Sequence, residues 1–311
     1  MADPFGLFLG FVALLAVAFL AVYAYYESAG APAPLRTRHG LTPRRSAVAV
    51  AVGVGVAVLV VAVGGRVSFE AAFASRRSVL RVGLWVVVLV GACEAVAGGY
   101  GFARRWWRCR PDRVDATGRV EAGTTAVSGT VTDDHADAAP VTGRSAVCWS
   151  WSVSVTGPGL RRYDEDDPHR TVDGGTGGCP FVLDDGSGPL CVDPTDATLV
   201  LDGERSVVRR PDSEPPDGFA DPAPSVEADY ADRPREYTET VLRPGDTATV
   251  WGAVVSDDDG PVLRGPQTTI VAGSPVGVAR RYRRRAAGYA LAGIAGGAVG
   301  VLGLLWSVGG L

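Results

Sequence analysis

The sequence predicts four transmembrane α-helices and a mainly β soluble domain, either a small barrel or a sandwich. Three observations lead to this prediction. Four windows are apolar over about 20 residues, the length that crosses a hydrocarbon core. The region between the third and fourth windows alternates apolar and polar residues, and it holds most of the acidic residues. The chain has 311 residues, enough for one or two domains.

The apolar windows are nearly free of charge and have arginine-rich flanks. Four such runs are difficult to bury in a soluble core, so we interpret them as membrane-spanning helices. Their expected bounds are about residues 4–26, 46–65, 82–101 and 286–308. The expected domains are residues 1–107 with three helices, 108–279 as the soluble domain, and 280–311 with the last helix.

The arginines predict an orientation. The chain contains no lysine, so all 30 basic residues are arginine. Basic residues concentrate on the cytoplasmic side of membrane segments. Clusters at residues 36–45, 104–110 and 280–285 agree only if the N-terminus is outside and the soluble domain is cytoplasmic. In that reducing compartment the cysteines need no disulfide partners.

The soluble region is strongly acidic. Between Pro111 and Gly273, 30 acidic residues face 13 arginines, a net charge of −17. Such a surface repels nucleic-acid phosphates, so no nucleic-acid partner is expected. Two interpretations remain open: adaptation to a salty cytoplasm, where ions screen the self-repulsion, and an acidic docking surface for a basic partner.

The soluble region has the pattern of β-structure. Residues 145–155 alternate as a half-buried strand does, and Tyr237–Val255 is typical of strand–turn–strand with its break at Arg243–Asp246. Turn residues at Asp184–Gly188 and Asp257–Gly260 predict two hairpins. Many short strands with such turns favour a barrel or sandwich.

Two further segments predict irregular structure. Gly174–Gly178 has no following Lys–Ser/Thr pair, so it predicts a flexible loop rather than a phosphate cradle. Residues 209–235 are rich in proline and acidic residues and predict an irregular insertion.

No constellation of catalytic residues stands out. The cysteine spacing excludes a zinc ribbon, knuckle or RING, and no G-x-S-x-G nucleophile elbow is present. The sequence therefore predicts no catalytic residue, no cofactor and no metal.

Four motifs in sequence order resemble the GIDE domain, also called the BAM domain, of the MULAN/MAPL family of membrane E3 ubiquitin ligases. These are Gly129-x-Val131 as a strand start, Cys148 before a strand, the Phe181–Ala197 hairpin, and the L-x-P-G-D…V-x-G element from Leu242 to Gly252. The resemblance covers about half of the chain.

The resemblance implies a domain between two transmembrane helices, with ligase activity in a RING after the second one. A RING needs eight Cys or His ligands, and no cysteine follows Cys191. We therefore expect the family's partner-facing module without its RING finger.

The leading hypothesis is a membrane-anchored, non-catalytic module that presents its β domain to an unknown protein partner, with a strand edge near Trp149–Val155 among the expected surfaces. The alternative is an E3 ubiquitin ligase-like component that acts with a separate RING or E2 protein. The candidate partner-facing residues are Trp149, Trp151, Asp184, Asp185, Asp257, Asp258 and Asp259.

Two features belong to the membrane segments, whose other partners are lipids. Glu94 lies roughly midway along the third segment. It is a candidate for a transport-linked function, or else a carboxyl hydrogen-bonded to a neighbouring helix. Gly293 and Gly297 form a small-residue pair suited to a homo-oligomer contact, or else to packing within the chain.

Overall fold

The computed structural model describes residues 43–64, 76–132, 136–156, 169–202, 205–209, 234–257 and 260–307. The chain forms two compact units. A helical unit combines the residues up to Arg105 with those from Arg281, and a β unit extends from Trp106 to Arg280.

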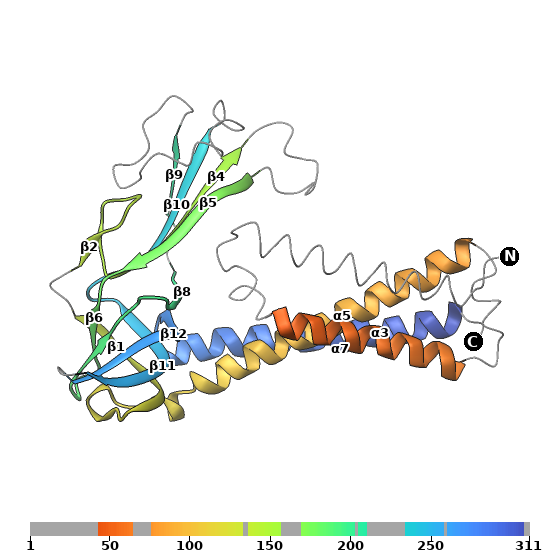
Figure 1. Ribbon diagram of the computed structural model, residues 1–311, viewed down its shortest axis with the longest axis horizontal. Coiled ribbons are helices and arrows are strands. Elements are labelled where there is room, and N and C mark those ends of the chain that lie inside the picture. Colours follow the sequence, from red (N-terminus) through yellow and green to blue (C-terminus); the bar gives the residue numbers. More distant parts are fainter. Residues whose placement is uncertain are drawn as a thin grey trace. The chain divides into compact units, whose positions relative to one another are not determined.

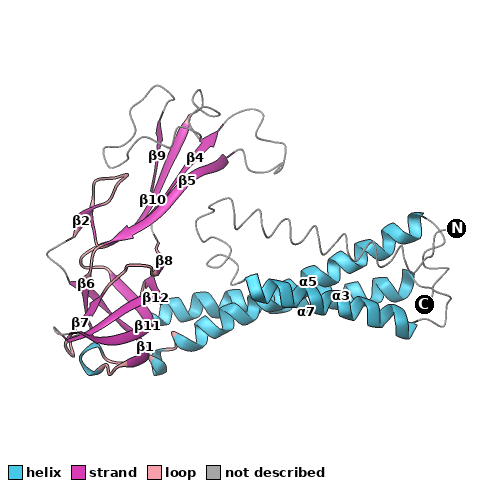
Figure 2. Ribbon diagram, in the orientation of Figure 1, coloured by secondary structure: helices cyan, strands magenta, loops and turns pink. Residues whose placement is uncertain are grey.

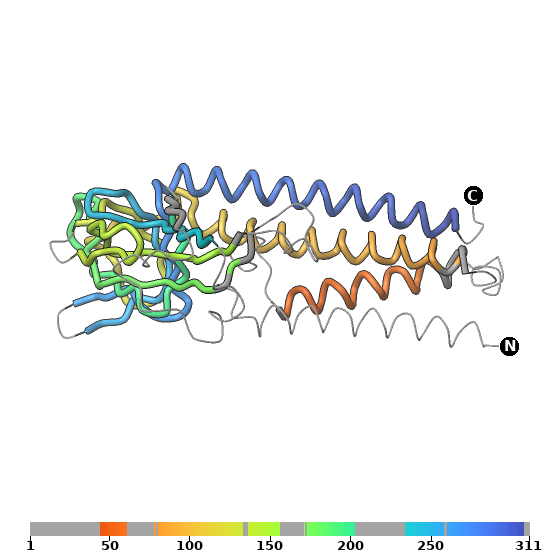
Figure 3. The backbone as a smooth tube through the Cα atoms, turned by 90° about the horizontal axis from the view of Figure 1, so that it is seen from above, coloured from red at the N-terminus to blue at the C-terminus, as the bar shows by residue number. Residues whose placement is uncertain are grey.

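The helical unit contains three described helices (Figures 1 and 3). They are α3 (Pro43–Gly64), α5 (Arg76–Arg108) and α7 (Pro275–Ser307), and the last two continue for one or two turns into the β unit. With 33 residues each, α5 and α7 are about 50 Å long.

Among the described residues, two helices are long and apolar enough to cross a membrane, Leu80–Arg108 and Pro275–Ser307. They contain the third expected segment and the fourth up to Ser307, which is consistent with a membrane protein. The second expected segment is the helix α3, and the first lies outside the described residues. Four transmembrane helices therefore remain a prediction.

Helix α3 forms despite a local sequence pattern that is typical of a strand. Its valines recur every second residue, as in a strand, and β-branched residues are mediocre helix formers. The segment is helical all the same. A helix satisfies every backbone hydrogen bond within one segment, which an apolar surrounding requires and a lone strand cannot do.

The helices pack through small residues. A Cβ on Gly293 would lie 2.6 Å from Val96 Cγ2, and one on Gly303 would lie 2.2 Å from Trp85 Cδ2. Because glycine allows such approaches, α7 packs closely against α5 along its length. The two helices run antiparallel. Gly293 is therefore used within the chain, as the packing alternative expected. Near the β-unit end, Phe102 and Tyr282 stack with ring centroids 6.2 Å apart.

The β unit is built on a closed barrel (Figure 2). Its strands are β1 (Gly123–Thr132), β6 (Phe181–Asp184), β7 (Pro189–Val192), β11 (Thr247–Asp257) and β12 (Gly260–Ala272). The order β11-β1-β6-β7-β12 closes through β11–β12 pairing, and only β7–β12 is parallel. A five-stranded Greek-key barrel with this order is the architecture of the OB-fold. Of the two folds expected for the β domain, the barrel is confirmed.

Glycines permit the curvature that closes the barrel. A Cβ on Gly252 would lie 2.6 Å from Thr268 Oγ1, at the point where the β11–β12 register shifts. A Cβ on Gly129 would lie 2.7 Å from the Asp184 carbonyl. Gly129 lies well inside β1, so it does not start a strand as the motif suggested. Both positions are places where two strands approach closely.

A second, open sheet extends from the barrel. Its strands are β4 (Cys148–Thr156), β5 (His169–Gly178), β9 (Arg205–Arg209) and β10 (Arg235–Leu242), ordered β5-β4-β10-β9 and all antiparallel. Cys148 and Leu242 are register partners and both are buried in the barrel core. β4 therefore begins at the barrel core and continues into the open sheet, and β10 runs back from that sheet and ends at the core.

Short elements complete the β unit. These are the 3-10 turns η1 (Pro111–Arg113) and η2 (Thr117–Arg119), the ribbon β2 (Asp137–Ala138) with β3 (Ser145–Ala146), and β8 (Thr198–Val200), which is parallel to β12. The expected insertion at 209–235 lies outside the described residues except at its ends. There Arg209 and Arg235 are register partners.

The glycine run Gly174–Gly178 was predicted to be a flexible loop, and this prediction is wrong. The run forms the C-terminal half of the strand β5 and is paired with β4 along its length. The side chains of the neighbouring strand explain why glycine is needed there.

Candidate functional site

The open sheet has two chemically different faces. Side chains directly opposite each other in neighbouring strands share a face. One face presents hydroxyl groups, and the other is aromatic and aliphatic. The hydroxyl face includes Ser150, Ser152, Ser154, Thr238 and Thr240, and the aromatic face includes Trp149, Trp151, Val153, Tyr237 and Val241.

The two indoles of the aromatic face lie across glycines of β5. Trp149 pairs with Gly177 and Trp151 with Gly175. A Cβ on Gly177 would lie 2.6 Å from the Trp149 Nε1 atom, and one on Gly175 would lie 3.1 Å from the Trp151 ring. Both tryptophans stay half-buried. The glycines of β5 therefore form the surface on which the two indoles pack, and both indoles also remain partly exposed to solvent.

β5 is also an edge strand. Within the described residues it pairs with β4 alone, so one row of its N–H and C=O groups faces away from the sheet. Such a row is a template for another extended chain. β4 itself pairs on both sides, so the expected strand edge near Trp149–Val155 lies one strand further out, at β5.

Glu239 of β10 holds the β2–β3 turn against the aromatic face. Its side chain is buried and accepts hydrogen bonds from the Val141 amide at 2.8 Å and the Thr142 amide at 3.2 Å. The Thr142 hydroxyl donates to it at 2.5 Å. A buried carboxylate with three donors is satisfied. These bonds hold the β2–β3 turn where Val141 packs on Tyr237 and Val153.

Sequence reasoning missed Glu239. A signal was present, because the residue lies between Tyr237 and Val241 with the period of two that marks one face of a strand. Without the β2–β3 turn, however, nothing in the sequence indicates that this face receives donors.

Asp184 and Asp185 belong to the β6–β7 hairpin. Their side chains form hydrogen bonds within this hairpin and to the turn η2. Asp184 accepts from the Gly186 amide at 2.7 Å. Asp185 accepts from the Ser187 hydroxyl and from Thr117, whose hydroxyl lies 2.8 Å away. The hydroxyl of Ser187 and then that of Thr117 lower the pKa of Asp185 to about 2. This carboxylate therefore joins the turn η2 to the hairpin.

The approach of η2 to this hairpin depends on glycine. A Cβ on Gly118 would lie 2.2 Å from the Ser187 carbonyl oxygen, and the Gly118 amide donates to the Ser187 hydroxyl at 2.9 Å. Gly188 has a φ of +142°. Asp185 was proposed from sequence as a partner contact; its geometry favours a structural role, although the side chain is exposed.

The other acidic hairpin joins β11 and β12. Asp257 forms an ion pair with Arg264 at 3.2 Å, and both side chains are exposed. Asp258 and Asp259 lie outside the described residues. Asp184 and Asp257 are the last residues of the barrel strands β6 and β11, whereas Trp149 and Trp151 lie on the open sheet.

One cysteine of the β unit, Cys148, is structural in character. Cys148 is buried in the barrel core, and this burial raises the pKa of its thiol to about 12. At neutral pH it is a thiol, which is a weak nucleophile. Within the part of the chain that the structure describes, no group of three or more His, Cys, Asp or Glu residues could hold a metal ion.

Glu94 of α5 is hydrogen-bonded to a neighbouring helix. The Ser46 hydroxyl lies 2.8 and 2.7 Å from its two carboxylate oxygens. Glu94 lies roughly midway along α5, as expected, and level with the first turn of α3, where Ser46 lies beside Arg44 and Arg45. The bond is the one that the alternative interpretation of Glu94 expected.

Comparison with known proteins adds one finding. Residues 161–305 match the family model of GIDE, described as E3 ubiquitin ligase. No curated protein and no solved structure was found to match. The match runs from the region before β5 into α7 and includes the Phe181–Ala197 and Leu242–Gly252 motifs of the GIDE resemblance, but not Gly129–Val131 or Cys148. The match begins after Trp149 and Trp151, so these tryptophans lie outside it.

Proposed function

We propose that this protein is anchored in a membrane and uses its β unit to hold an extended segment of a protein partner against the edge of β5. The observation that carries the proposal is the glycine edge strand, with the half-buried Trp149 and Trp151 lying across it. The GIDE match supports the assignment of the β unit to a family described as E3 ubiquitin ligase.

The recognition would be strand addition. The outward N–H and C=O groups of β5 supply main-chain hydrogen bonds, and neighbouring side chains supply selectivity. The indole of Trp149 offers an apolar surface beside this edge. A net charge of −17 between Pro111 and Gly273 favours a basic segment, because complementary charge speeds encounter.

Anchoring in the membrane is supported by α5 and α7. Both are long and apolar enough to cross a bilayer. Arg104 and Arg105 lie near the end of α5, and Arg280–Arg285 lie in the first turns of α7, where the chain enters and leaves the β unit. Basic residues favour the cytoplasmic side, which supports a cytoplasmic β unit.

Photo-crosslinking tests the proposal. Benzoylphenylalanine is placed in the full chain at Thr176, exposed on β5, and in a control at Thr124, exposed on β1 of the barrel. We expect a discrete protein adduct in native membranes from position 176 and none from position 124. Trp149→Ala should weaken the adduct at least several-fold, and Trp149→Phe should weaken it less.

Equal adducts at both positions, or an adduct at 176 that is insensitive to Trp149→Ala in a folded variant, would contradict binding at β5. The fold of each variant is checked by circular dichroism of the purified chain in detergent.

The alternative function is a component of ubiquitin-type modification that acts with a separate RING or E2 protein. The description of the matched family favours it. It is tested by mixing the purified chain with an activating enzyme, an E2 and a RING protein and measuring modifier transfer. Transfer that depends on the chain would support it, and transfer at the same rate without the chain would rule it out.

A further inference from the structure

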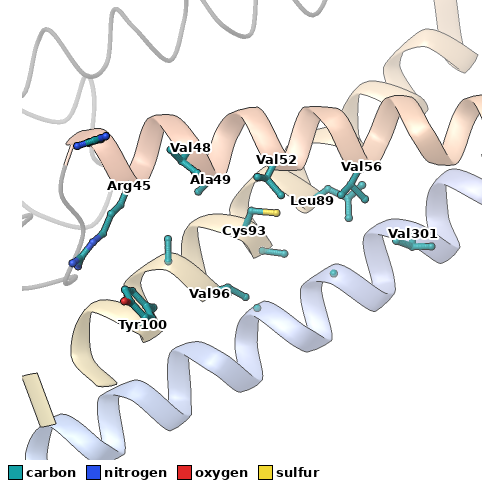
Figure 4. A pocket seen from close by; sticks show the side chains of 15 residues that line it. Arg45, Val48, Ala49, Val52, Val56, Leu89, Cys93, Val96, Tyr100 and Val301 are labelled. Atoms are coloured by element: carbon teal, nitrogen blue, oxygen red, sulfur yellow. The ribbon is translucent and has the colours of Figure 1, made fainter. Parts of the chain in front are cut away.

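A groove of about 680 Å³ lies in the helical unit between α3, α5 and α7 (Figure 4). Its wall is apolar over nearly all of its length. The main contributors are Val48, Val52 and Val56 of α3, Leu89 and Val96 of α5, and Val301 of α7. The volume falls within the range of about 300–1,000 Å³ that is typical of small-molecule sites.

One end of the groove is cationic. Arg44 and Arg45 line it where α3 begins, and Arg44 is exposed. The Arg45 guanidinium lies 5.4 Å from the centroid of the Tyr100 ring, which lines the same end. Glu94 is the one acidic residue in the sequence of the three helices, and it accepts a hydrogen bond from the Ser46 hydroxyl. Two guanidinium groups followed by an apolar channel suit a ligand with an anionic head and a hydrocarbon tail.

The glycines of α7 have different roles along this groove. Gly293 and Gly300 approach α5 so closely that a Cβ would lie 2.6 Å from Val96 and 2.8 Å from Leu89. Gly297 also lines the groove, but a Cβ there would meet no atom within 4 Å. Gly293 and Gly300 thus hold the helices together, while Gly297 leaves open space in the groove.

We propose that the groove seats one acyl chain of an anionic glycerophospholipid, with the lipid phosphate at Arg44 and Arg45. The inference rests on the membrane anchoring proposed above but not on partner binding at β5. A groove of this volume has room for a narrow hydrocarbon chain. Anionic lipid headgroups are attracted to arginines at this level of a membrane helix.

The test is native mass spectrometry of the full chain after extraction into detergent and addition of phosphatidylglycerol. We expect one phosphatidylglycerol to be retained by the wild type, and at least a five-fold lower occupancy in Gly297→Leu, which fills the groove. Gly91→Leu is the matched control, because Gly91 of α5 also has no atom within 4 Å of an added Cβ and does not line the groove. It should retain the lipid.

The head-group contact is tested separately. Arg44→Ala/Arg45→Ala should lower phosphatidylglycerol occupancy several-fold and leave retention of zwitterionic phosphatidylcholine unchanged. Arg283→Ala/Arg284→Ala, two exposed arginines of α7 that do not line the groove, should change neither. Equal losses in both double variants would indicate diffuse attraction to the surface and overturn the site.

Benzoylphenylalanine at Val96 identifies the occupant directly in native membranes. A phospholipid adduct is expected. An adduct to residues 4–26 of the same chain, an adduct to a second copy, or unchanged lipid retention in Gly297→Leu would overturn the proposal. None of these results depends on a cross-link at Thr176, so failure here is distinguishable from failure of partner binding at β5.

Discussion

The closed barrel and the open sheet are built from different strands of the β unit, and their side chains have different environments. In the barrel, large aliphatic residues such as Leu183, Leu190, Leu263 and Ile270 are fully buried, and every strand has neighbours on both sides. In the open sheet, one face carries hydroxyl groups and two tryptophans stay half-buried beside an edge. Closure removes edges and favours stability, whereas an open edge retains hydrogen-bonding capacity for another chain. The barrel is therefore the support, and the open sheet is the surface suited to binding.

The largest expected effect tests the barrel. Leu263→Ala removes a fully buried side chain and leaves a cavity, so we expect it to lower the free energy of unfolding by about 2–5 kcal/mol. The urea midpoint of the full chain in detergent, followed by circular dichroism, measures this. Val255→Ala on β11 is the control, since Val255 is exposed and should change stability by less than about 0.5 kcal/mol. Equal effects would mean that the barrel core is not the main source of stability.

The second prediction concerns Gly175 and Gly177 of β5, on which the two indoles pack. Gly177→Val places atoms within the space of the Trp149 indole and should cost about 1–3 kcal/mol through overpacking. It should also displace the indole and alter tryptophan fluorescence. Gly175→Ala, where the contact is 3.1 Å, should cost less. If both variants have the stability and emission spectrum of the wild type, the indoles do not rest on β5.

The third prediction sharpens the role of the turn over the aromatic face. Glu239→Ala leaves the Val141 and Thr142 amides without their acceptor and should cost about 1–3 kcal/mol. Hydrogen exchange should quicken across residues 139–144 while barrel amides stay protected. Glu239→Gln keeps an acceptor oxygen and should show a smaller change. Unchanged exchange in Glu239→Ala would refute the anchoring role.

The fourth prediction uses pH. Hydrogen bonds from Ser187 and Thr117 hold the pKa of Asp185 at about 2, below the usual value of 3.8. A depressed folded-state pKa adds stability that is present above the unfolded pKa and is lost as pH falls toward 2. Asp185→Asn should therefore lower Tm modestly at pH 6, and the difference from wild type should shrink between pH 4 and 2. Glu121→Gln, at an exposed residue, should show no such trend. A Tm difference between wild type and Asp185→Asn that does not change with pH would show that the charge of Asp185 does not cause the stabilisation.

The smallest expected effect is at the barrel hairpin. Arg264→Ala breaks the exposed ion pair with Asp257 and should change stability by no more than about 0.5 kcal/mol. Raising the salt concentration should reduce even this difference. A loss comparable to that of Leu263→Ala would show that the hairpin tip supports the barrel, contrary to its exposure.

Sequence patterns predicted the parts of the β unit whose signals are local. The hairpins at Phe181–Val192 and Val254–Leu263 follow from alternation interrupted by Gly and Asp turns. The strand β5 was missed because glycine has low strand propensity, and its conformation is stabilised by indoles from another segment. Asp185 was recognised as a hairpin residue, but its bond to Thr117 crosses 68 positions and carries no local signal.

The sequence by itself determined the apolar segments, the acidic β region and the GIDE resemblance, because each depends on composition or on patterns within a few residues. Tertiary structure decided that the barrel closes through β11 and β12, that Glu239 holds a turn almost a hundred residues away, and that a glycine run forms an edge strand. It also decided that Gly293 packs within the chain while Gly297 opens onto a groove. These outcomes depend on which distant side chains meet, and excluded volume and hydrogen-bond satisfaction act only once they have met.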